Sequence, residues 1–484
     1  MNNESADVTT EKPKRIHDEA PSDLFANFMK SGWTPSSLGD LPPLEVVTYA
    51  FTRRQVLSES FKGIRIVLPA GGYKVRANDT DYNYRPHSAY VYYSGVQGAD
   101  ATAEAVLVLE PSGDSHITYL YMNPRSTRDT DAFYRDAKYG ELWVGRRFTL
   151  DEAKARYQID TRHLSELETL LSDSKETLTL RSVDQLVDKN VKTHAREEEF
   201  ATFVSEQRLC KDGYEIAELQ AAVDASALGF NDVIAAIPAA VETPRGERVL
   251  DAAFYGRARI LGNDLGYNTI VGAGSHACVL HWIRNDGDVH RGELVLVDAG
   301  VEMQSFYTAD ITRTLPVDGK FSPAQRALYM LVYESQLAGF AAIKPGVLFS
   351  EINKACQEVL AKGLADMGVL TVSAEESLKP EVGLHRRWTL HGVSHHLGLD
   401  VHDCAQARKE MYLDSPLREG MVLTVEPGLY IQPDDELFAP EYRGIGIRIE
   451  DDVVVTADGC RNLSEDIPRH PDDIEKWMKR ILGR

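Results

Sequence analysis

Four of the chain's 14 histidines lie within thirteen positions, in the stretch HGVSHHLGLDVHD at residues 391–403. A helix is not expected there, because Gly392 and Gly398 interrupt any helical pattern. Four core histidines are not expected either, because each buried imidazole needs partners for two ring nitrogens. A metal site, a substrate site and a histidine-rich surface loop remain as interpretations of this stretch.

Two aspartates in ELVLVDAGVEMQSFYTADITRTL, residues 293–315, lie in strand-like segments on either side of a turn. If the hairpin is centred on Gln304, Asp298 and Asp310 lie directly opposite each other, since both are six positions from the centre. Directly opposed residues share a face and lie about 5 Å apart at Cβ. Two like charges at that distance destabilise a hairpin unless something cationic lies between them.

Two glutamates lie at the ends of further strand-like segments. In GIGIRIE (444–450), side chains alternate between faces, so Arg448 and Glu450 share a face with two glycines that leave space beside them. In VLTVEPG, Glu426 precedes a proline, which holds its backbone extended. Each acid alone has an ordinary interpretation as a turn, strand-end or solvated residue. Four acids together with a histidine cluster match what a binuclear metal site requires.

Electrostatics favour metal for these carboxylates. Four of them in one pocket make six repulsive pairs, each of about 4 kcal/mol at 4 Å and an effective dielectric constant of 20. Their sum, on the order of 20 kcal/mol, exceeds the total stability of a typical protein. The acids must therefore be protonated or neutralised, and two divalent cations would balance four negative charges. Oxygen-rich ligands with one imidazole and no thiolate suit Mn²⁺, or Fe²⁺, Co²⁺ or Zn²⁺, better than a structural zinc.

The pattern of apolar residues predicts two folded regions that would position these side chains. We expect a polar arm over residues 1–45 with one short helix around residues 23–29, a smaller α/β domain over 46–190, and a larger domain over 191–484. In the smaller domain, the predicted strands are 63–70, 89–95, 103–110 and 116–122, and residues 163–174 predict an amphipathic helix.

Helices come first in the larger domain, and its last third is rich in strands. The predicted helices are 198–208, 214–229, 245–262, 323–342 and 349–366, and the predicted strands are 268–273, 277–283, 293–299, 421–431, 444–450 and 452–457. Helices packed on a mostly antiparallel sheet give an α+β architecture.

Composition limits the partners and the compartment. A net charge of −21 makes wrapping of a nucleic-acid backbone unexpected. The sequence contains no apolar run long enough to span a membrane and no apolar leader at its start. Five widely spaced cysteines without a CxxC pattern indicate free thiols in a reducing cytoplasm. Peptides, small molecules and metals remain as partners.

The motifs LVLVDAG, TADITRT, HGVSHHLGLDVHD, VLTVEPGLYI and YRGIGIRIEDDVVVT occur in this order over roughly residues 198–470. In them the chain closely resembles the pita-bread metallopeptidases, and among these the aminopeptidase P (Xaa-Pro aminopeptidase) family. Residues 46–190 resemble the amino-terminal domain of that family through NDTDYNYRPHSAYVYYSG (78–95). The resemblance implies a pita-bread catalytic domain preceded by a smaller, creatinase-like α/β domain.

The resemblance also implies a ligand set for two divalent metal ions, with Mn²⁺ expected. Motif by motif, the ligands are Asp298 and Asp310, His395 as the sole imidazole, and Glu426 and Glu450. Because all five positions hold metal-competent residues, catalytically inactive relatives of the fold are disfavoured. In this interpretation only one histidine of the 391–403 cluster binds metal.

The remaining residues take roles in binding and catalysis by the same resemblance. Removal of the residue before proline would proceed by attack of a hydroxide that bridges the two metals, with Glu426 as general base. The implied catalytic and substrate-binding side chains are His402 at the scissile carbonyl oxygen, His391 at the proline ring, His281 near the leaving nitrogen, Arg448 beyond the proline, and Tyr267 on a metal-binding aspartate.

One position departs from the family pattern. The family usually has an aromatic residue, often tryptophan, directly after the metal-binding histidine, whereas this chain has His396. We include His396 among the substrate-binding candidates because it affects the shape of the pocket, although a solvated or neighbour-bonded imidazole is the simpler interpretation.

Three other functions remain open at this point. Prolidase, which cleaves Xaa-Pro dipeptides, shares all five ligands. Methionine aminopeptidase usually lacks the amino-terminal α/β domain, and a non-enzymatic binding module would not need the complete ligand set. We further expect a homodimer or homotetramer assembled through the amino-terminal domain, and the NDTDYNYR loop is a candidate to reach a neighbouring active site.

Overall fold

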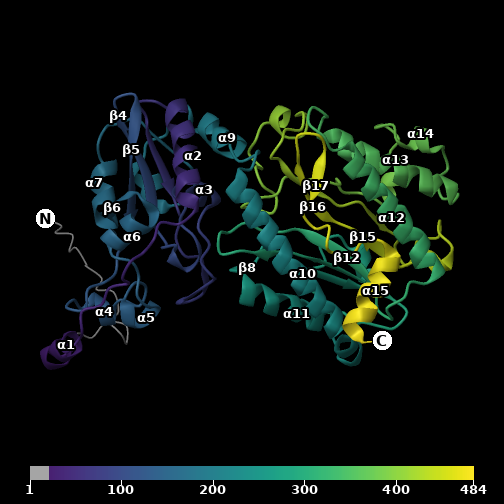
Figure 1. Cartoon of the computed structure of the whole chain (residues 1–484), viewed down its shortest axis with the longest axis horizontal. Helices are drawn as coiled ribbons and strands as arrows, with labels where there is room; N and C mark the ends of the chain where they lie inside the picture. Colours follow the sequence, from purple (N-terminus) through teal and green to yellow (C-terminus); the bar gives the residue numbers. More distant parts are fainter. Residues whose placement is uncertain (1–20, 484) are drawn as a thin grey trace, which may run out of the picture.

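The chain folds into two lobes in the computed structural model, which describes residues 21–483. The amino-terminal lobe and the larger carboxy-terminal lobe lie side by side, and helix α9 (Glu197–Glu206) lies between them (Figure 1). Of the polar arm predicted for residues 1–45, residues 1–20 lie outside the described residues. None of the helices in residues 21–483 has the length and apolar character needed to cross a bilayer.

A five-stranded sheet of order β6-β5-β4-β1-β7 forms the centre of the amino-terminal lobe. Its strands are β1 (Arg65–Pro69), β4 (Val106–Ser112), β5 (Ser115–Met122), β6 (Asp160–His163) and β7 (Thr177–Thr179), and a small pair lies outside it, β2 (Val75–Ala77) with β3 (Thr80–Asp81). The interior strand β1 is buried along its whole length, which agrees with its apolar sequence from Ile66 to Pro69.

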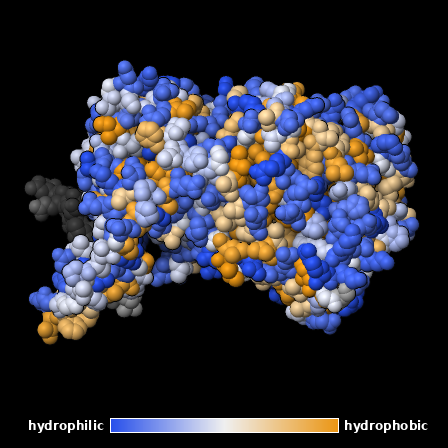
Figure 2. Space-filling model, viewed as in Figure 1, coloured by the Kyte–Doolittle hydropathy of each residue, from blue (hydrophilic) through white to orange (hydrophobic). Residues whose placement is uncertain are grey.

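Helices pack around this sheet. They are α2 (Val46–Ser60), α3 (Ser88–Ser94), α4 (Ala132–Arg135), α5 (Glu141–Val144), α6 (Leu150–Tyr157), α7 (Leu167–Leu171) and α8 (Gln185–Asn190). The predicted short helix in the arm is confirmed as α1 (Asp23–Lys30), which projects from the lobe. Apolar side chains gather at its tip (Figure 2), where Leu24 is 83% exposed and Phe28 is 76% exposed.

The strand predicted for residues 89–95 is wrong, because this segment forms helix α3. His87 caps the start of the helix by accepting a hydrogen bond at Nδ1 from the backbone N–H of Ala89. Gly95 ends it in the left-handed conformation with φ 73°. All seven helical residues are buried. Complete burial leaves the segment without the alternation of apolar and polar residues that would identify a face, and the tertiary packing overrides the preference of Tyr and Val for strands.

Three small sheets and a set of long helices form the carboxy-terminal lobe. The sheets have the orders β12-β10-β9, β13-β16-β17 and β14-β15, and the pair β11-β8 lies beside them. The strands are β8 (Asp264–Leu265), β9 (Ile270–Ala273), β10 (Leu294–Ala299), β11 (Val301–Glu302), β12 (Ile311–Pro316), β13 (Val422–Val425), β14 (Gly428–Tyr430), β15 (Gly446–Arg448), β16 (Asp451–Val455) and β17 (Cys460–Asn462). All their pairings are antiparallel.

The long helices pack in pairs over these strands (Figure 1). Helix α10 (Gly213–Glu242) packs against α11 (Gly246–Leu261), and α12 (Pro323–Ala342) packs against α13 (Ser350–Asp366). The remaining helices are α14 (Ala374–Ser377) and α15 (Pro471–Leu482). Helix α10 continues beyond the predicted end at residue 229, and Pro238 lies inside it. The predicted α+β architecture is confirmed.

A second predicted strand, 277–283, is also wrong. Residues Gly274–Cys278 form a 3-10 helix, and the chain then turns. The cause is Glu247, a buried carboxylate in the first turn of α11. It accepts hydrogen bonds from the backbone N–H groups of Ala273 and Gly287 and from Trp282 Nε1, at 2.7 to 2.9 Å. The loop folds around this one side chain, so its apolar sequence does not enter a sheet.

Candidate metal centre

A cavity of about 570 Å³ in the carboxy-terminal lobe gathers nearly all of the residues singled out by the sequence. This volume is typical of a binding site for a small ligand. The predicted site residues among its lining are Tyr267, His281, Asp298, Asp310, His391, His395, His402, Glu426, Arg448 and Glu450. His396 is the one predicted site residue that the structure does not bring to this cavity.

The four acids come from four strand ends. Asp298 is on β10, Asp310 directly precedes β12, Glu426 lies between β13 and β14, and Glu450 lies between β15 and β16. The predicted hairpin register is wrong by two residues, because Asp298 pairs with Thr312 rather than with Asp310. A shift of two residues keeps every side chain on its original face. Asp310 therefore still faces the cavity beside Asp298, diagonally rather than directly opposite.

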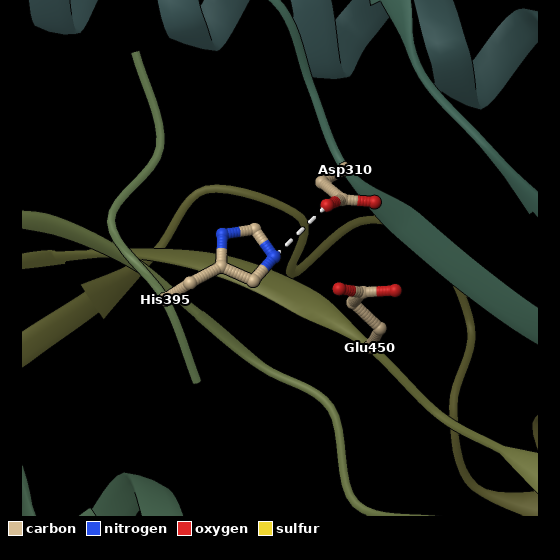
Figure 3. A group of neighbouring side chains, drawn as sticks. All are labelled: Asp310, His395 and Glu450. Atoms are coloured by element: carbon tan, nitrogen blue, oxygen red, sulfur yellow. Dashed lines mark ion pairs between the residues drawn. The ribbon is translucent and has the colours of Figure 1, made fainter. Parts of the chain in front are cut away.

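Three of the side chains converge closely enough to share one ion. One ligand atom each from Asp310, His395 and Glu450 lies within 4.8 Å of the other two (Figure 3). His395 Nε2 lies 3.3 Å from Asp310 Oδ2 and 3.4 Å from Glu426 Oε1. The backbone N–H of His395 donates to Thr424 Oγ1 at 3.1 Å, and the ring Nδ1 lies 3.1 Å from the carbonyl oxygen of His396. These two contacts hold the imidazole in place.

Asp298 is held from both sides. Tyr267 Oη donates to Oδ1 at 2.6 Å, and Arg448 Nη2 donates to Oδ2 at 2.5 Å. The other nitrogens of Arg448 donate to Thr312 Oγ1 and to Tyr430 Oη. The guanidinium of Arg448 therefore connects Asp298 to Thr312 and Tyr430 and fixes their relative positions. A carboxylate oriented in this way is pre-organised as a metal ligand.

The acids carry too little positive charge around them to be ionised together. Burial, with Asp310 and Glu426 nearby, raises the pKa of Glu450 well above its usual range. Burial also raises the pKa of Glu426 to about 7, although His395 opposes the shift. Burial disfavours the imidazolium of His395, but the hydrogen bond to Asp310 and the charge of Glu426 outweigh it and raise its pKa to about 9. A protonated His395 thus supplies part of the positive charge that the carboxylates require. This donor set therefore fits divalent metal ions, which would supply that charge in full.

Three further histidines border the acids. His391 Nε2 lies 2.7 Å from Tyr430 Oη, and its Nδ1 lies 3.5 Å from Glu426 Oε2. Burial lowers the pKa of His391 to about 4, with Arg448 adding to the effect. The ring of His402 packs edge-on against that of His395, with 4.4 Å between centroids. His281 lines the same cavity from the loop around Glu247.

His396 points away from the cavity, and the expectation of a solvated or neighbour-bonded imidazole is wrong. The residue is 0% exposed, and neither ring nitrogen has a hydrogen-bond partner among the described residues. The ring stacks on Phe349, with 5.5 Å between centroids, and packs edge-on against Tyr412. It therefore fills an aromatic place in the core, and its position gives it no contact with a ligand in the cavity.

The sequence analysis missed four residues that complete the site. Thr312 Oγ1 donates to Glu450 Oε2 at 2.6 Å, and the buried Asp452 accepts from the backbone N–H of Asp310 at 3.0 Å. Thr424 and Tyr430 contact His395 and Arg448 as described above. The alternation in TADITRT carries the signal for Thr312, since it places this residue on the face of Asp310.

Comparison with known proteins places this geometry in a family. The model of metallopeptidase family M24 matches residues 217–457, and the model of the aminopeptidase P N-terminal domain matches residues 50–180. The chain belongs to metallopeptidase family M24, with a pita-bread domain that follows an aminopeptidase P amino-terminal domain. The predicted family and fold class are confirmed, and the family implies divalent metal ions.

Individual relatives are similar along nearly the whole chain. Xaa-Pro aminopeptidase 1 of Streptomyces coelicolor is 48% identical over 96% of this chain and 93% of its own length. Xaa-Pro aminopeptidase of Escherichia coli is 34% identical over 88% of this chain and 96% of its own. A solved structure of zinc-substituted E. coli aminopeptidase P in complex with product superposes with a TM-score of 0.78 at 32% identity, covering 91% of this chain and 99% of that one.

Proposed function

We propose that this protein is a metal-dependent Xaa-Pro aminopeptidase, which removes the amino-terminal residue from peptides with proline in the second position. The observation that carries the proposal is the convergence of four carboxylates and one imidazole in a single cavity bordered by three more histidines. Relatives that are similar over nearly the whole chain carry the name Xaa-Pro aminopeptidase, which favours this activity over that of a prolidase.

Five residues would hold two divalent cations: Asp298, Asp310, His395, Glu426 and Glu450. We propose Mn²⁺ as the metal, because the donors are mostly oxygen atoms with no thiolate among them. Divalent cations bound there would supply the Lewis acidity that activates water for attack on a peptide carbonyl.

The chain's own residues then move protons and orient the substrate. Glu426 accepts a proton from the attacking water and delivers it to the leaving prolyl nitrogen, a task that suits a carboxylate in the cavity beside the reacting atoms. His402 donates a hydrogen bond to the carbonyl oxygen as negative charge develops there. Because burial lowers the pKa of His402, its neutral form donates through one N–H.

Selection of proline rests on the other cavity residues. His391 contacts the proline ring, and His281 lies near the leaving nitrogen. Arg448 anchors the part of the substrate beyond the proline, in addition to its hydrogen bond with Asp298. A prolyl nitrogen carries no hydrogen in a peptide, and a pocket shaped for the proline ring disfavours ordinary peptides.

The test compares metal-stripped protein with and without Mn²⁺ on an Xaa-Pro-Yaa tripeptide and an Xaa-Pro dipeptide, following release of the first residue. Mn²⁺-dependent cleavage of the tripeptide with little cleavage of the dipeptide is the expected result. Preference for the dipeptide would make the protein a prolidase. Absence of cleavage with metal bound would overturn the proposal.

We also propose that the protein forms a homodimer or homotetramer in the cytoplasm. Support for assembly is the exposed apolar tip of α1 (Figure 2), and all five cysteines are free thiols, as a reducing compartment favours. We further propose that the amino-terminal domain begins after residue 45 and ends at residue 190. Sedimentation velocity of the full chain measures the oligomeric mass, and a monomer at all concentrations would contradict assembly.

A further inference from the structure

The backbone between His395 and His402 is held by charged side chains from outside it. In the described part of the chain, no group hydrogen-bonds the ring of His402, so its orientation depends on the segment that carries it. His402 lines the metal-centre cavity on one side and a second cavity of about 390 Å³ between the lobes on the other. A ring with open space on two sides needs a fixed backbone to keep its position.

Two residues of the amino-terminal lobe contact this segment directly. Arg85 Nη2 donates to the carbonyl oxygen of Leu399, and Ser88 Oγ donates to Asp400 Oδ1. Arg85 is itself fixed by Glu302, with 2.6 Å between Nε and Oε2. Its Nη1 also donates to Ser88 Oγ at 3.1 Å, so the two residues act together.

The same segment is held from the opposite side by two buried cations. Arg208 Nη2 donates to Asp400 Oδ2 at 2.9 Å and to Asp403 Oδ1 at 2.8 Å. Lys211 Nζ donates to Asp403 Oδ2 at 3.0 Å. Asp403 also closes the loop, because its backbone N–H donates to the carbonyl oxygen of His396 at 2.9 Å.

We infer that Arg85 and Ser88 are positioning residues for His402, through which the amino-terminal lobe sets the geometry of the metal centre in its own chain. The inference rests on the role of His402 in the proposed function. The loop NDTDYNYR, a candidate to reach a neighbouring active site, lies in this structure against the carboxy-terminal lobe of the same chain. Asn83 Nδ2 donates there to Asp264 Oδ2 at 2.8 Å, away from the His402 segment.

The first test measures kinetics of Ser88→Ala and Arg85→Ala with the Xaa-Pro-Yaa peptide. We expect kcat to fall by about tenfold to a hundredfold with KM nearly unchanged, because misplacing a group that acts in the transition state affects kcat. Gln97→Ala is the matched control, since it removes another contact between the lobes, the hydrogen bond from Gln97 Nε2 to Tyr214 Oη at 2.5 Å, and leaves the segment untouched. Its kcat should equal that of the wild type.

Ser88→Ala is the decisive variant of the two. Arg85→Ala leaves the carboxylate of Glu302 buried without its guanidinium partner, which can impair folding. Ser88→Ala removes only a hydroxyl. A fall in kcat for Gln97→Ala equal to that for Ser88→Ala would assign the effect to general loosening of the lobes and overturn the inference.

The second test is a double-mutant cycle with His402→Ala. If Ser88 acts through His402, adding Ser88→Ala to His402→Ala should lower kcat by less than about twofold, because the positioned group is already gone. A full repeat of the effect of Ser88→Ala in that background would show that Ser88 acts by another route. Bound metal, measured in each variant, should equal that of the wild type.

A third measurement does not depend on activity. In protein labelled at histidine Cε1, the His402 resonance is identified by its loss in His402→Ala. We expect it to shift in Ser88→Ala and to stay in place in Gln97→Ala. An unchanged signal in Ser88→Ala overturns the inference, even if the wild type cleaves the peptide. Failure of the wild type to cleave overturns the proposed function alone, since the histidine signal still decides the inference.

Discussion

At the scale of single residues, the candidate metal centre consists of acids that cannot all be ionised without cations beside them. Asp298, Asp310 and Glu450 are each at most 7% exposed, and among the described residues only His395 and Arg448 form ion pairs with them. Residue types and strand alternation are sufficient to predict this group, because buried carboxylates are rare without partners. The hydrogen bonds that other residues make to the acids, such as that from Thr312 to Glu450, depend on which strands become neighbours. These contacts are harder to predict from sequence.

Asp310→Asn should weaken metal binding and lower kcat by at least about a hundredfold, since an amide does not neutralise a divalent cation as a carboxylate does. Metal content by mass spectrometry and peptide cleavage check the two effects. Asp318→Asn is the matched control, because Asp318 lies just after β12 and pairs with Arg291 at the surface. Unchanged metal content in Asp310→Asn would remove this residue from the ligand set.

Tyr267→Phe should weaken metal binding about tenfold to a hundredfold by removing the hydrogen bond to Asp298. The carboxylate keeps its contact with Arg448, so the thermal unfolding temperature should change little. Titration of the metal-stripped protein with Mn²⁺ measures the affinity. Tyr255→Phe, at an exposed position of α11, serves as the control, and an equal loss of affinity there would contradict a specific role for Tyr267.

At the scale of elements, the sequence predicted the strands that carry the acids and failed at two apolar segments. Strands β10, β13 and β16 are mostly apolar, and acidic residues lie at or directly beside one end of each, so both their type and these ends are visible in the sequence. The segment 89–95 is equally apolar but is helical, because His87 and Gly95 cap it and burial surrounds it. The segment 277–283 folds around the buried carboxylate of Glu247, which accepts a hydrogen bond from Trp282. This contact is distant in the sequence, so no local pattern reveals it.

The His87 cap predicts a pH dependence of stability. Burial, with a contribution from Arg208, lowers the pKa of His87 from 6.5 to about 4. Between these values the unfolded chain binds a proton that the folded chain does not, so stability rises with pH over this range and is lost as pH falls from about 6.5 to about 4. The loss from this one group is about 3 kcal/mol at most.

His87→Asn should remove this part of the pH dependence, because asparagine can cap α3 without titrating. Urea unfolding at pH 7, 6 and 5 measures the free energy of unfolding of both proteins. The stability of the variant relative to the wild type should increase steadily toward pH 5. Parallel curves for the two proteins over that range would show that His87 does not control the slope.

At the scale of the whole molecule, the two lobes are joined by buried ion pairs as well as by α9. Arg53 on α2 donates from Nη2 to Asp212 Oδ2 at 2.7 Å, and the same nitrogen lies 3.4 Å from Glu215 Oε2. Asp212 caps α10, the longest helix of the carboxy-terminal lobe, so this contact ties helix α2 of one lobe to helix α10 of the other. The burial of Glu215 means that its carboxylate depends on Arg53 and on Tyr307, which donates to it at 2.9 Å.

Arg53→Met keeps the bulk of the side chain and removes its charge. We expect it to lower the free energy of unfolding by about 3 kcal/mol or more, because the buried carboxylate of Glu215 then loses its ion-pair partner. Denaturation should also change from one transition to two, as the lobes lose their coupling and unfold separately. Arg257→Met is the matched control: Arg257 pairs with Asp232 at the surface of the carboxy-terminal lobe, and exposed pairs contribute up to about 1 kcal/mol. Arg53→Met could instead be as stable as Arg257→Met and unfold in one transition. The coupling of the lobes would then come from α9 and the Arg85 contacts. In that case, removing Arg85 rather than Arg53 should separate the two transitions.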